Sequence, residues 1–162
     1  MSDLTRAVFD CNVLLQALAA PDGPAGRCVQ LALGRRIELV ISPRELAELT
    51  EVAARPRVAT KLRLTPELVM AFITALELVA VSVDSVPEQF AYERDPDDAH
   101  YVNLALAAEA EVLVSRDSDL LALADGTSAQ GAEFRSRFPG LRISDPVAFL
   151  RGFEAEQHSG AS

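Results

Sequence analysis

Short apolar runs separated by longer amphipathic stretches make up most of this chain. The runs predict buried β-strands over residues 7–9, 37–41, 79–83, 112–114 and 141–143. The stretches between them predict helices over residues 12–19, 25–34, 43–54, 58–62, 66–78 and 118–123, and two more that begin near residues 96 and 146. This alternation favours a three-layer α/β/α fold, in which helices cover both faces of a mostly parallel sheet of four to five strands.

Two stretches lack such a pattern. Residues 124–140 are rich in glycine, serine and polar side chains, so we expect a loop there. The chain after Glu156 is expected to be loose, as chain ends commonly are. We therefore expect a single domain over residues 1–152, followed by a flexible tail over residues 153–162.

Four acidic side chains lie at the edges of predicted elements. Asp10 directly follows the first strand, and Asp117 lies just beyond the fourth. Asp98 is in the first turn of one helix, and Glu48 lies one turn into another. Active sites of parallel sheets lie beyond the carboxyl ends of the strands, so we expect these four acids to meet at one rim.

Most of these acids also have a structural interpretation that the pattern leaves open. Asp98 and its neighbour Asp97 could stabilise the positive end of the helix behind the Asp95 cap. Asp117 could simply be an N-cap, and Glu48 could be a solvated helix residue. Asp10 is the hardest to explain in this way, because a carboxylate directly after an apolar strand needs a partner or an ion.

The helix that carries Glu48 begins with a recognisable start signal. Ser42-Pro43-Arg44-Glu45 combines an N-cap, a proline at the first helical position and a glutamate three residues after the cap. We interpret this as a capping box in which the Glu45 side chain returns to Ser42. Glu48 is then the acid of this helix that is available for a site.

Several carboxylates at one rim require a cation or protons. Two carboxylates about 5 Å apart repel by roughly 3 kcal/mol at an effective dielectric of 20. Ligands that are all oxygen suit the hard ions Mg²⁺ and Mn²⁺ better than zinc. Such an ion lowers the pKa of its bound water and neutralises charge on a phosphate, so the cluster favours phosphodiester hydrolysis.

Four motifs resemble those of the PIN-domain family, in the same order. Phe9-Asp10-Cys11-Asn12-Val13-Leu14 is similar to the opening Asp-x-Asn-hydrophobic motif, and residues 42–49 resemble the second, with Glu48 in the acidic position. Residues 95–98 with the helix after them resemble the third motif, and residues 114–120 resemble the fourth. Two departures are a serine at position 115, where threonine is commoner, and the length of the 124–140 stretch. The similarity extends from about residue 5 to residue 150.

The resemblance implies a Mg²⁺- or Mn²⁺-dependent endoribonuclease, often the toxin of a bacterial toxin–antitoxin pair. The catalytic and metal-binding residues that it implies are Asp10, Glu48, Asp98 and Asp117. It also implies that Asn12 and Ser115 orient Asp10 and Asp117, and that Asp97 and Asp119 are auxiliary acids. RNA is then the substrate, and the protein partners it suggests are an antitoxin and a second copy of the chain.

Charge is unevenly distributed along the 162 residues, whose formal net charge is −9. Residues 27–63 carry eight basic and four acidic side chains, and the remainder carries seven basic and twenty acidic ones. Such a segment can offer a local cationic patch to a phosphate backbone. Our candidates for RNA binding are Arg55, Arg57, Arg63 and Arg116. The alternative is an ordinary solvated helix surface, which the distribution does not distinguish.

Two other functions stay open on the sequence alone. A haloacid-dehalogenase-type phosphatase would use Asp10 as nucleophile, but it also needs a lysine near the phosphate, and the sole lysine, Lys61, lies in a helical stretch with no strand before it. A catalytically silent PIN-like binding module would keep the fold and act through a partner. The presence of all four acids gives that alternative no support.

The remaining features are those of a packed, water-soluble chain. Apolar residues make up 49% and charged residues 24% of the sequence, and no apolar run approaches the roughly 18 residues that span a bilayer. The first residues do not form a basic signal peptide. We therefore expect a cytoplasmic protein with no membrane contact, in which Cys11 and Cys28 are buried hydrophobes and His100 packs rather than acts as an acid or base.

Overall fold

The computed structural model describes residues 4–92 and 94–160. Its elements in chain order are β1 (Arg6–Phe9), α1 (Cys11–Ala19), α2 (Pro24–Leu33), β2 (Glu38–Ile41), α3 (Pro43–Ala54), α4 (Pro56–Leu62), α5 (Pro66–Val79), β3 (Val81–Ser82), α6 (Pro96–Ala107), β4 (Val112–Val114), α7 (Ser118–Ala124), α8 (Ala129–Arg137), β5 (Arg142–Ser144) and α9 (Pro146–Gly160). None of the helices described is long and apolar enough to cross a membrane.

The strands form one parallel sheet in the order β3-β2-β1-β4-β5. The central strand β1 pairs with a strand on each side, so that Val8 lies opposite both Val40 and Leu113. The chain builds outward from β1 in one direction through β2 and β3, and then in the other direction through β4 and β5. The order therefore reverses between β1 and β4, where sheets of this kind offer a crevice beyond the strand ends. The predicted α/β architecture is confirmed.

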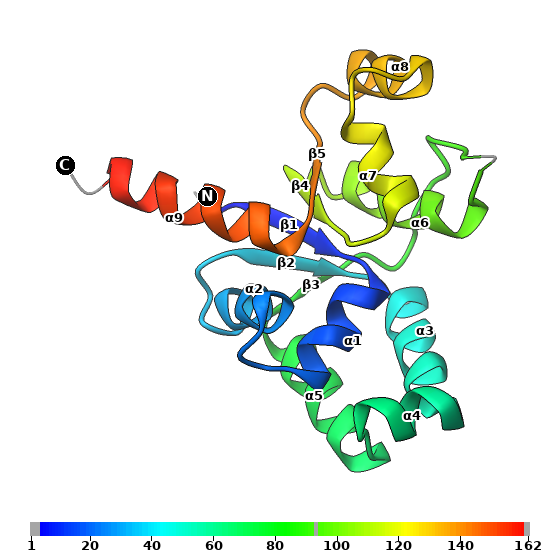
Figure 1. The fold of residues 1–162 in the computed structure, drawn as a ribbon, viewed down its shortest axis with the longest axis vertical. Coiled ribbons are helices and arrows are strands. Elements are labelled where there is room, and N and C mark those ends of the chain that lie inside the picture. The colour runs from blue at the N-terminus through cyan, green and yellow to red at the C-terminus, as the bar shows by residue number, and fades with distance from the viewer. Residues whose placement is uncertain (1–3, 93, 161–162) are drawn as a thin grey trace.

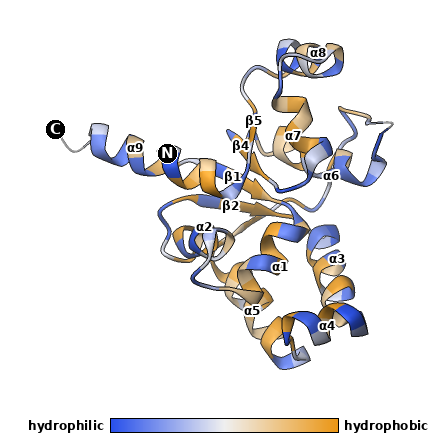
Figure 2. Cartoon of the chain, viewed as in Figure 1, coloured by the Kyte–Doolittle hydropathy of each residue, from blue (hydrophilic) through white to orange (hydrophobic). Residues whose placement is uncertain are grey.

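Helices cover both faces of the sheet. The first-half helices α1, α2, α3 and α5 pack on one another, whereas α6 packs against β1, β2 and β4, and α7 packs against β5 (Figure 1). The strands are apolar on both faces because both are covered: the side chains of residues 7–9, 39–41 and 112–114 are buried. Figure 2 shows hydrophobic residues along the middle of β1 and β2 and polar residues on the far end of α9.

The expected loop over residues 124–140 is wrong, because most of it is helix α8. The hydroxyl of Ser128 caps this helix by accepting a hydrogen bond from the N–H of Gly131. A Cβ at Gly131 would lie 2.2 Å from the carbonyl oxygen of Asp125, so this glycine serves a close approach rather than a loop. Phe134 anchors the helix, since it is buried and packs edge-on against Phe90 at 5.3 Å between ring centroids.

Two boundaries also differ from the prediction. The third strand is shorter than expected, because α5 continues to Val79 and β3 has only two residues. Helix α9 continues to Gly160, so residues 153–160 are not a loose tail, and residues 161–162 lie outside the described chain. The extension is anchored on α2: Phe153 is buried, and Glu154 pairs with Arg27 at 3.1 Å.

Candidate active site

Asp10 lies at the carboxyl end of the central strand, between β1 and α1. One carboxylate oxygen accepts a hydrogen bond from the N–H of Val13 at 2.9 Å, which makes Asp10 the N-cap of α1, and the other accepts a short hydrogen bond from the Ser115 hydroxyl. The side chain is only 3% exposed. Burial raises the pKa of Asp10 from 3.8 to about 6 against the opposing effect of these hydrogen bonds, and the charges of Asp117 and Glu48 add to the rise.

Ser115 connects the ends of β1 and β4. Its hydroxyl donates to Asp10 and accepts a hydrogen bond from the N–H of Asp117 at 3.0 Å. Asp117 in turn caps α7, because its carboxylate accepts from the N–H groups of Asp119 at 2.8 Å and Leu120 at 3.3 Å. The structural interpretation of Asp117 as an N-cap is therefore correct. The same side chain also contacts a second carboxyl group, so Asp117 belongs to the acid cluster as well as to the helix cap.

That carboxyl group belongs to Asp98, in the first turn of α6. Asp98 is buried and forms a hydrogen bond with Asp117, while its Oδ2 atom has no hydrogen-bond partner among the described residues. Burial is the largest cause that raises the pKa of Asp98 to about 8, followed by the charges of Asp117 and Asp95. A hydrogen bond between two carboxyl groups requires a proton, so in the absence of a cation this pair holds one near neutral pH.

Helix α3 places two glutamates on the side of the site. Ser42 caps the helix as predicted, by accepting a hydrogen bond from the N–H of Glu45 at 3.2 Å. The Glu45 carboxyl does not return to Ser42, however: it is fully buried, and neither of its oxygens has a hydrogen-bond partner within the described chain. Burial raises the pKa of Glu45 well above its usual range, and the charges of Asp10 and Glu48 raise it further. The predicted capping box is thus wrong in its second half.

Glu48 lies one turn further along α3 and is half-buried. The hydroxyl of Tyr101 lies beside its carboxylate and accepts a hydrogen bond from the N–H of Cys11 at 3.3 Å. Tyr101 thereby connects Glu48 to the first turn of α1, directly beside Asp10. Tyr101 occupies an apolar position in the helical periodicity of α6, so the sequence pattern gives no sign of this polar contact.

A second group of acids lies on the other side of Asp98. Ligand oxygens of Asp95, Asp98 and Asp119 lie within 4.8 Å of one another. Asp95 caps α6 by accepting from the N–H of Asp97 at 3.1 Å, whereas Asp97 itself is exposed and outside this group. Asp95 was missed as a candidate ligand. The signal was its spacing, since a cap residue and the third helical residue approach each other at a helix start.

The acids therefore form two adjoining groups. We call Asp10, Glu45 and Glu48 the inner acids and Asp95, Asp98 and Asp119 the outer acids, with Asp117 hydrogen-bonded to Asp98 and facing Asp10. Within the described chain, one ion pair involves these acids: it joins Asp119 to the Arg94 guanidinium at 3.5 Å. The donors are all oxygen, and buried oxygens of Glu45 and Asp98 lack partners. A hard divalent cation fits this set, because it would replace the protons that otherwise limit the repulsion.

The remaining candidates lie outside the cluster. Asn12 is exposed on the first turn of α1, and the structure gives no hydrogen bond from its side chain to the rest of the described chain. Arg55, at the end of α3, pairs with Glu51 at 3.0 Å, and Arg57 and Arg63 are exposed on and after α4. Arg116 is exposed between β4 and α7, where it lines a separate pocket of about 420 Å³.

His100 joins the starts of the two helices that carry acids. It is buried, and its Nε2 lies 3.1 Å from the Ser42 hydroxyl at the cap of α3. Burial lowers the pKa of His100, and the charge of Arg44 acts in the same direction. The histidine is thus a packed neutral group that braces α6 against α3, and the expectation of packing is confirmed. Cys11 and Cys28 are likewise buried and free.

Comparison with known proteins gives two matches. A family model described as a PIN domain matches residues 6–119, a range that begins with β1 and contains every inner and outer acid. The chain is also similar to an uncharacterized protein from Methanocaldococcus jannaschii, with 26% identity over 149 residues that cover 92% of each chain.

Proposed function

The chain belongs to the PIN-domain family, and on that premise we propose that it is an endoribonuclease that requires Mg²⁺ or Mn²⁺ and hydrolyses RNA phosphodiester bonds. The observation that carries the proposal is the convergence of carboxylates from β1, α3, α6 and the β4–α7 junction at the switch point of the sheet. Family membership also sets aside the phosphatase alternative, which required a different fold family.

The energetics of the cluster support a cation. Asp10 and Asp98 have raised pKa values of about 6 and 8, and burial is the first cause in both. A protein that only needed a stable fold would gain from replacing buried acids of one sign by apolar or amide side chains. Retaining them is understandable if a divalent ion completes the site.

Each element of the site has a distinct task in this proposal. Asp10, Asp98, Asp117 and Glu48 would hold the ion, directly or through water. Ser115 orients Asp10 and Asp117, because its single hydroxyl contacts both, and Tyr101 lies beside Glu48. When bound, the ion would supply a water of lowered pKa and positive charge for the phosphate. Asp119 and Asp95 would complete the outer side, where a second ion or the leaving oxygen of the substrate could be accommodated.

A cleavage assay tests this function. The full chain is incubated with mixed structured RNAs and with DNA of the same sequences, in Mg²⁺, in Mn²⁺ and in EDTA, and the cut ends are sequenced. We expect defined internal cuts in RNA that EDTA abolishes and that Asp10→Asn lacks. RNA cleavage that persists in EDTA or in the Asp10→Asn protein would contradict the proposal.

A silent binding module is distinguished by the metal itself. We expect Mn²⁺ to raise the melting temperature of the wild-type protein and not that of Asp10→Asn, because the ion binds the folded site and not the unfolded chain. A module that had lost its chemistry together with its metal would show neither stabilisation by Mn²⁺ nor cleavage.

We extend the proposal to a toxin role with an antitoxin partner, which rests on the family resemblance alone. Induced expression in a bacterial host should then arrest growth, while expression of the Asp10→Asn protein at an equal level should not. Normal growth at a high level of active enzyme would remove the toxin role and leave the ribonuclease proposal intact.

A further inference from the structure

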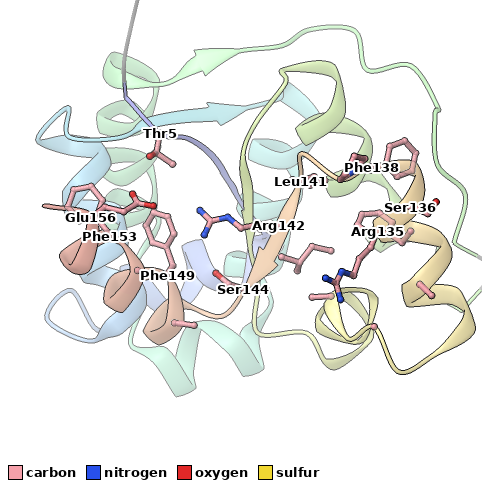
Figure 3. Close-up of a pocket in the computed structure, with 18 residues that line it drawn as sticks. Thr5, Arg135, Ser136, Phe138, Leu141, Arg142, Ser144, Phe149, Phe153 and Glu156 are labelled. Atoms are coloured by element: carbon pink, nitrogen blue, oxygen red, sulfur yellow. The ribbon is translucent and has the colours of Figure 1, made fainter. Parts of the chain in front are cut away.

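The free edge of the sheet forms the floor of a groove between α8 and α9. β5 is the last strand in the order β3-β2-β1-β4-β5, so one of its sides has no neighbouring strand. The groove has a volume of about 810 Å³, and Figure 3 shows α9 on one side of β5 and α8 on the other. None of the inner or outer acids lines it. It is therefore separate from the proposed active site.

The backbone of β5 leaves hydrogen-bonding groups in this groove. The N–H of Arg142 donates to the carbonyl of Glu111 at 2.9 Å, and the carbonyl of Ser144 accepts from the N–H of Ser115 at 2.9 Å. Both groups therefore point toward β4. Because backbone groups of successive strand residues alternate in direction, the N–H and C=O of Ile143 between them point to the free side. The floor thus offers a donor and an acceptor in the arrangement that an added strand uses.

The walls of the groove are apolar. The apolar side chains that line it come from α8, the α8–β5 connection, β5 and α9, and include Phe134, Phe138, Leu141, Ile143, Phe149 and Phe153. Ser144 adds one polar group, a buried hydroxyl with no hydrogen-bond partner among the described residues. An open strand edge beside apolar walls is a surface that proteins normally cover.

The charges of the groove indicate what covers it. Arg135 and Arg142 line it, against Glu156 as the acidic lining residue. Figure 3 shows the Arg142 side chain extending from β5 toward α9. Within the described chain this guanidinium takes part in no recorded ion pair. Its counter-charge is therefore free to come from a ligand.

We propose that this groove binds an extended acidic segment of a partner protein, which adds to β5 as a sixth strand of the sheet. The segment's backbone would pair with Ile143, its apolar side chains would pack between the aromatic walls, and its carboxylates would meet Arg135 and Arg142. Strand addition of this kind takes affinity from backbone hydrogen bonds and specificity from alternate side chains. The inference does not depend on the nuclease activity.

Two other occupants fit the groove less well. A second copy of the chain would have to present its own β5 edge, which is equally recessed between its α8 and α9, so two such edges are not self-complementary. RNA would find two arginines but a wall of aromatic and aliphatic side chains around them, which offers few contacts to a phosphate backbone.

The test uses a fluorescein-labelled heptapeptide of alternating glutamate and valine as the probe, with binding to the full chain followed by fluorescence anisotropy. Two matched peptides replace every glutamate by lysine, or the central valine by proline, which removes a backbone N–H. Two protein variants, Arg142→Glu and Arg135→Glu, reverse the groove's charge, and Lys61→Glu, at an exposed position of α4, is the control. We expect the lysine and proline peptides, and both groove variants, to bind at least tenfold more weakly, and Lys61→Glu to bind as the wild type does.

Amide hydrogen exchange supplies an independent readout. The peptide should slow exchange of the Ile143 N–H at least tenfold in the wild type, and it should leave this exchange unchanged in Arg142→Glu and Arg135→Glu. Absence of binding to the wild type, equal binding by either groove variant, or full binding of the proline peptide would overturn the proposal. A dimer seen by light scattering that Arg142→Glu dissociates would assign the groove to a second copy instead. Binding of a uridine-rich RNA that the same variant abolishes would assign it to RNA.

Discussion

The inner and outer acids carry the same chemical group in two different environments. Asp10 and Glu45 of the inner group are buried, and Glu45 has no hydrogen-bond partner recorded in the described chain. Asp95 and Asp119 of the outer group are half-buried at the ends of helices, and Asp119 has Arg94 as a partner. Asp98, the third outer acid, is buried like the inner ones and also has an oxygen without a hydrogen-bond partner within the described chain. The difference indicates that Asp10, Glu45 and Asp98 are the acids that a cation must neutralise, whereas solvent can screen Asp95 and Asp119.

The largest effect is therefore expected at Asp10. Asp10→Asn keeps the N-cap of α1, because an amide oxygen can accept from the N–H of Val13, but it removes a charged ligand. We expect cleavage to fall by about a thousandfold or more, which corresponds to roughly 4 kcal/mol in the barrier, while the melting temperature of the metal-free protein rises. Rate measurements and thermal unfolding check both, with Glu67→Gln, an exposed acid on α5, as control. Retained cleavage would remove Asp10 from the site.

The two glutamates of α3 sharpen the comparison within the inner group. Burial raises the pKa of Glu45 and thereby favours its neutral form, which the amide of Glu45→Gln resembles. We expect Glu45→Gln to change cleavage by less than about tenfold and Glu48→Gln to lower it by about a hundredfold, since an amide is a poorer ligand for a hard cation. Mn²⁺ titrations of both variants provide the second measurement. If Glu45→Gln abolishes Mn²⁺ binding, Glu45 is itself a ligand and the roles must be exchanged.

Much of this site could be predicted from the sequence, and the exceptions have physical reasons. Asp10 directly follows the first buried strand and Asp117 lies just beyond the fourth, so the local pattern was enough to place them at one rim, whereas the role of Ser115 came from the family resemblance. Glu45 was assigned to a cap because the third helical position serves both a capping box and an inward-facing side chain, and only the packing of α3 against α1 decides between them. Helix α8 was missed because it depends on Phe134 meeting Phe90, a contact 44 residues apart that no local pattern contains.

Asp119, a half-buried outer acid, should show a smaller effect. Asp119→Asn removes a charge that Arg94 and solvent already compensate, and its backbone N–H, which caps α7 through Asp117, is unaffected. We expect cleavage to fall by about tenfold, mainly through weaker binding of metal or substrate rather than a slower chemical step. Measuring kcat and KM at several Mn²⁺ concentrations separates the two. A loss as large as that of Asp10→Asn would end the distinction between the groups.

The pH dependence of stability tests the buried charges directly. The pKa values of Asp10 and Asp98, about 6 and 8 in the folded protein, lie above the usual 3.8. The folded state therefore retains protons that the unfolded chain releases, so stability is greatest near pH 4 and is lost as pH rises to about 8. We expect the melting temperature of the metal-free protein to fall by roughly 5 °C or more between pH 5 and pH 8.

Two controls accompany the pH series. Saturating Mn²⁺ should restore the melting temperature at pH 8, because the cation replaces the lost protons. Asp10→Asn should flatten the dependence of the melting temperature on pH between pH 4 and pH 6, and should leave this dependence unchanged above pH 6. A melting temperature that rises from pH 4 to pH 8 would show that ionisation of these buried acids does not destabilise the metal-free protein.

The smallest expected effect concerns the exposed arginines, which lie outside both acid groups. Arg57 and Arg63 take part in no recorded ion pair within the described chain, and Arg55 shares its charge with Glu51 at 3.0 Å. Each phosphate contact on single-stranded RNA contributes about −0.7 to the slope of log affinity against log salt. Replacing all three arginines by alanine should therefore weaken RNA binding several-fold and flatten that slope by up to roughly 2 units, with Mn²⁺ affinity unchanged. Arg27→Ala together with Arg36→Ala, two exposed arginines of the same cationic segment that contact α9, is the matched control. An unchanged slope would mean that this end of α3 and α4 is an ordinary solvated surface, and the acid cluster would then have to take its RNA from the side of Arg116.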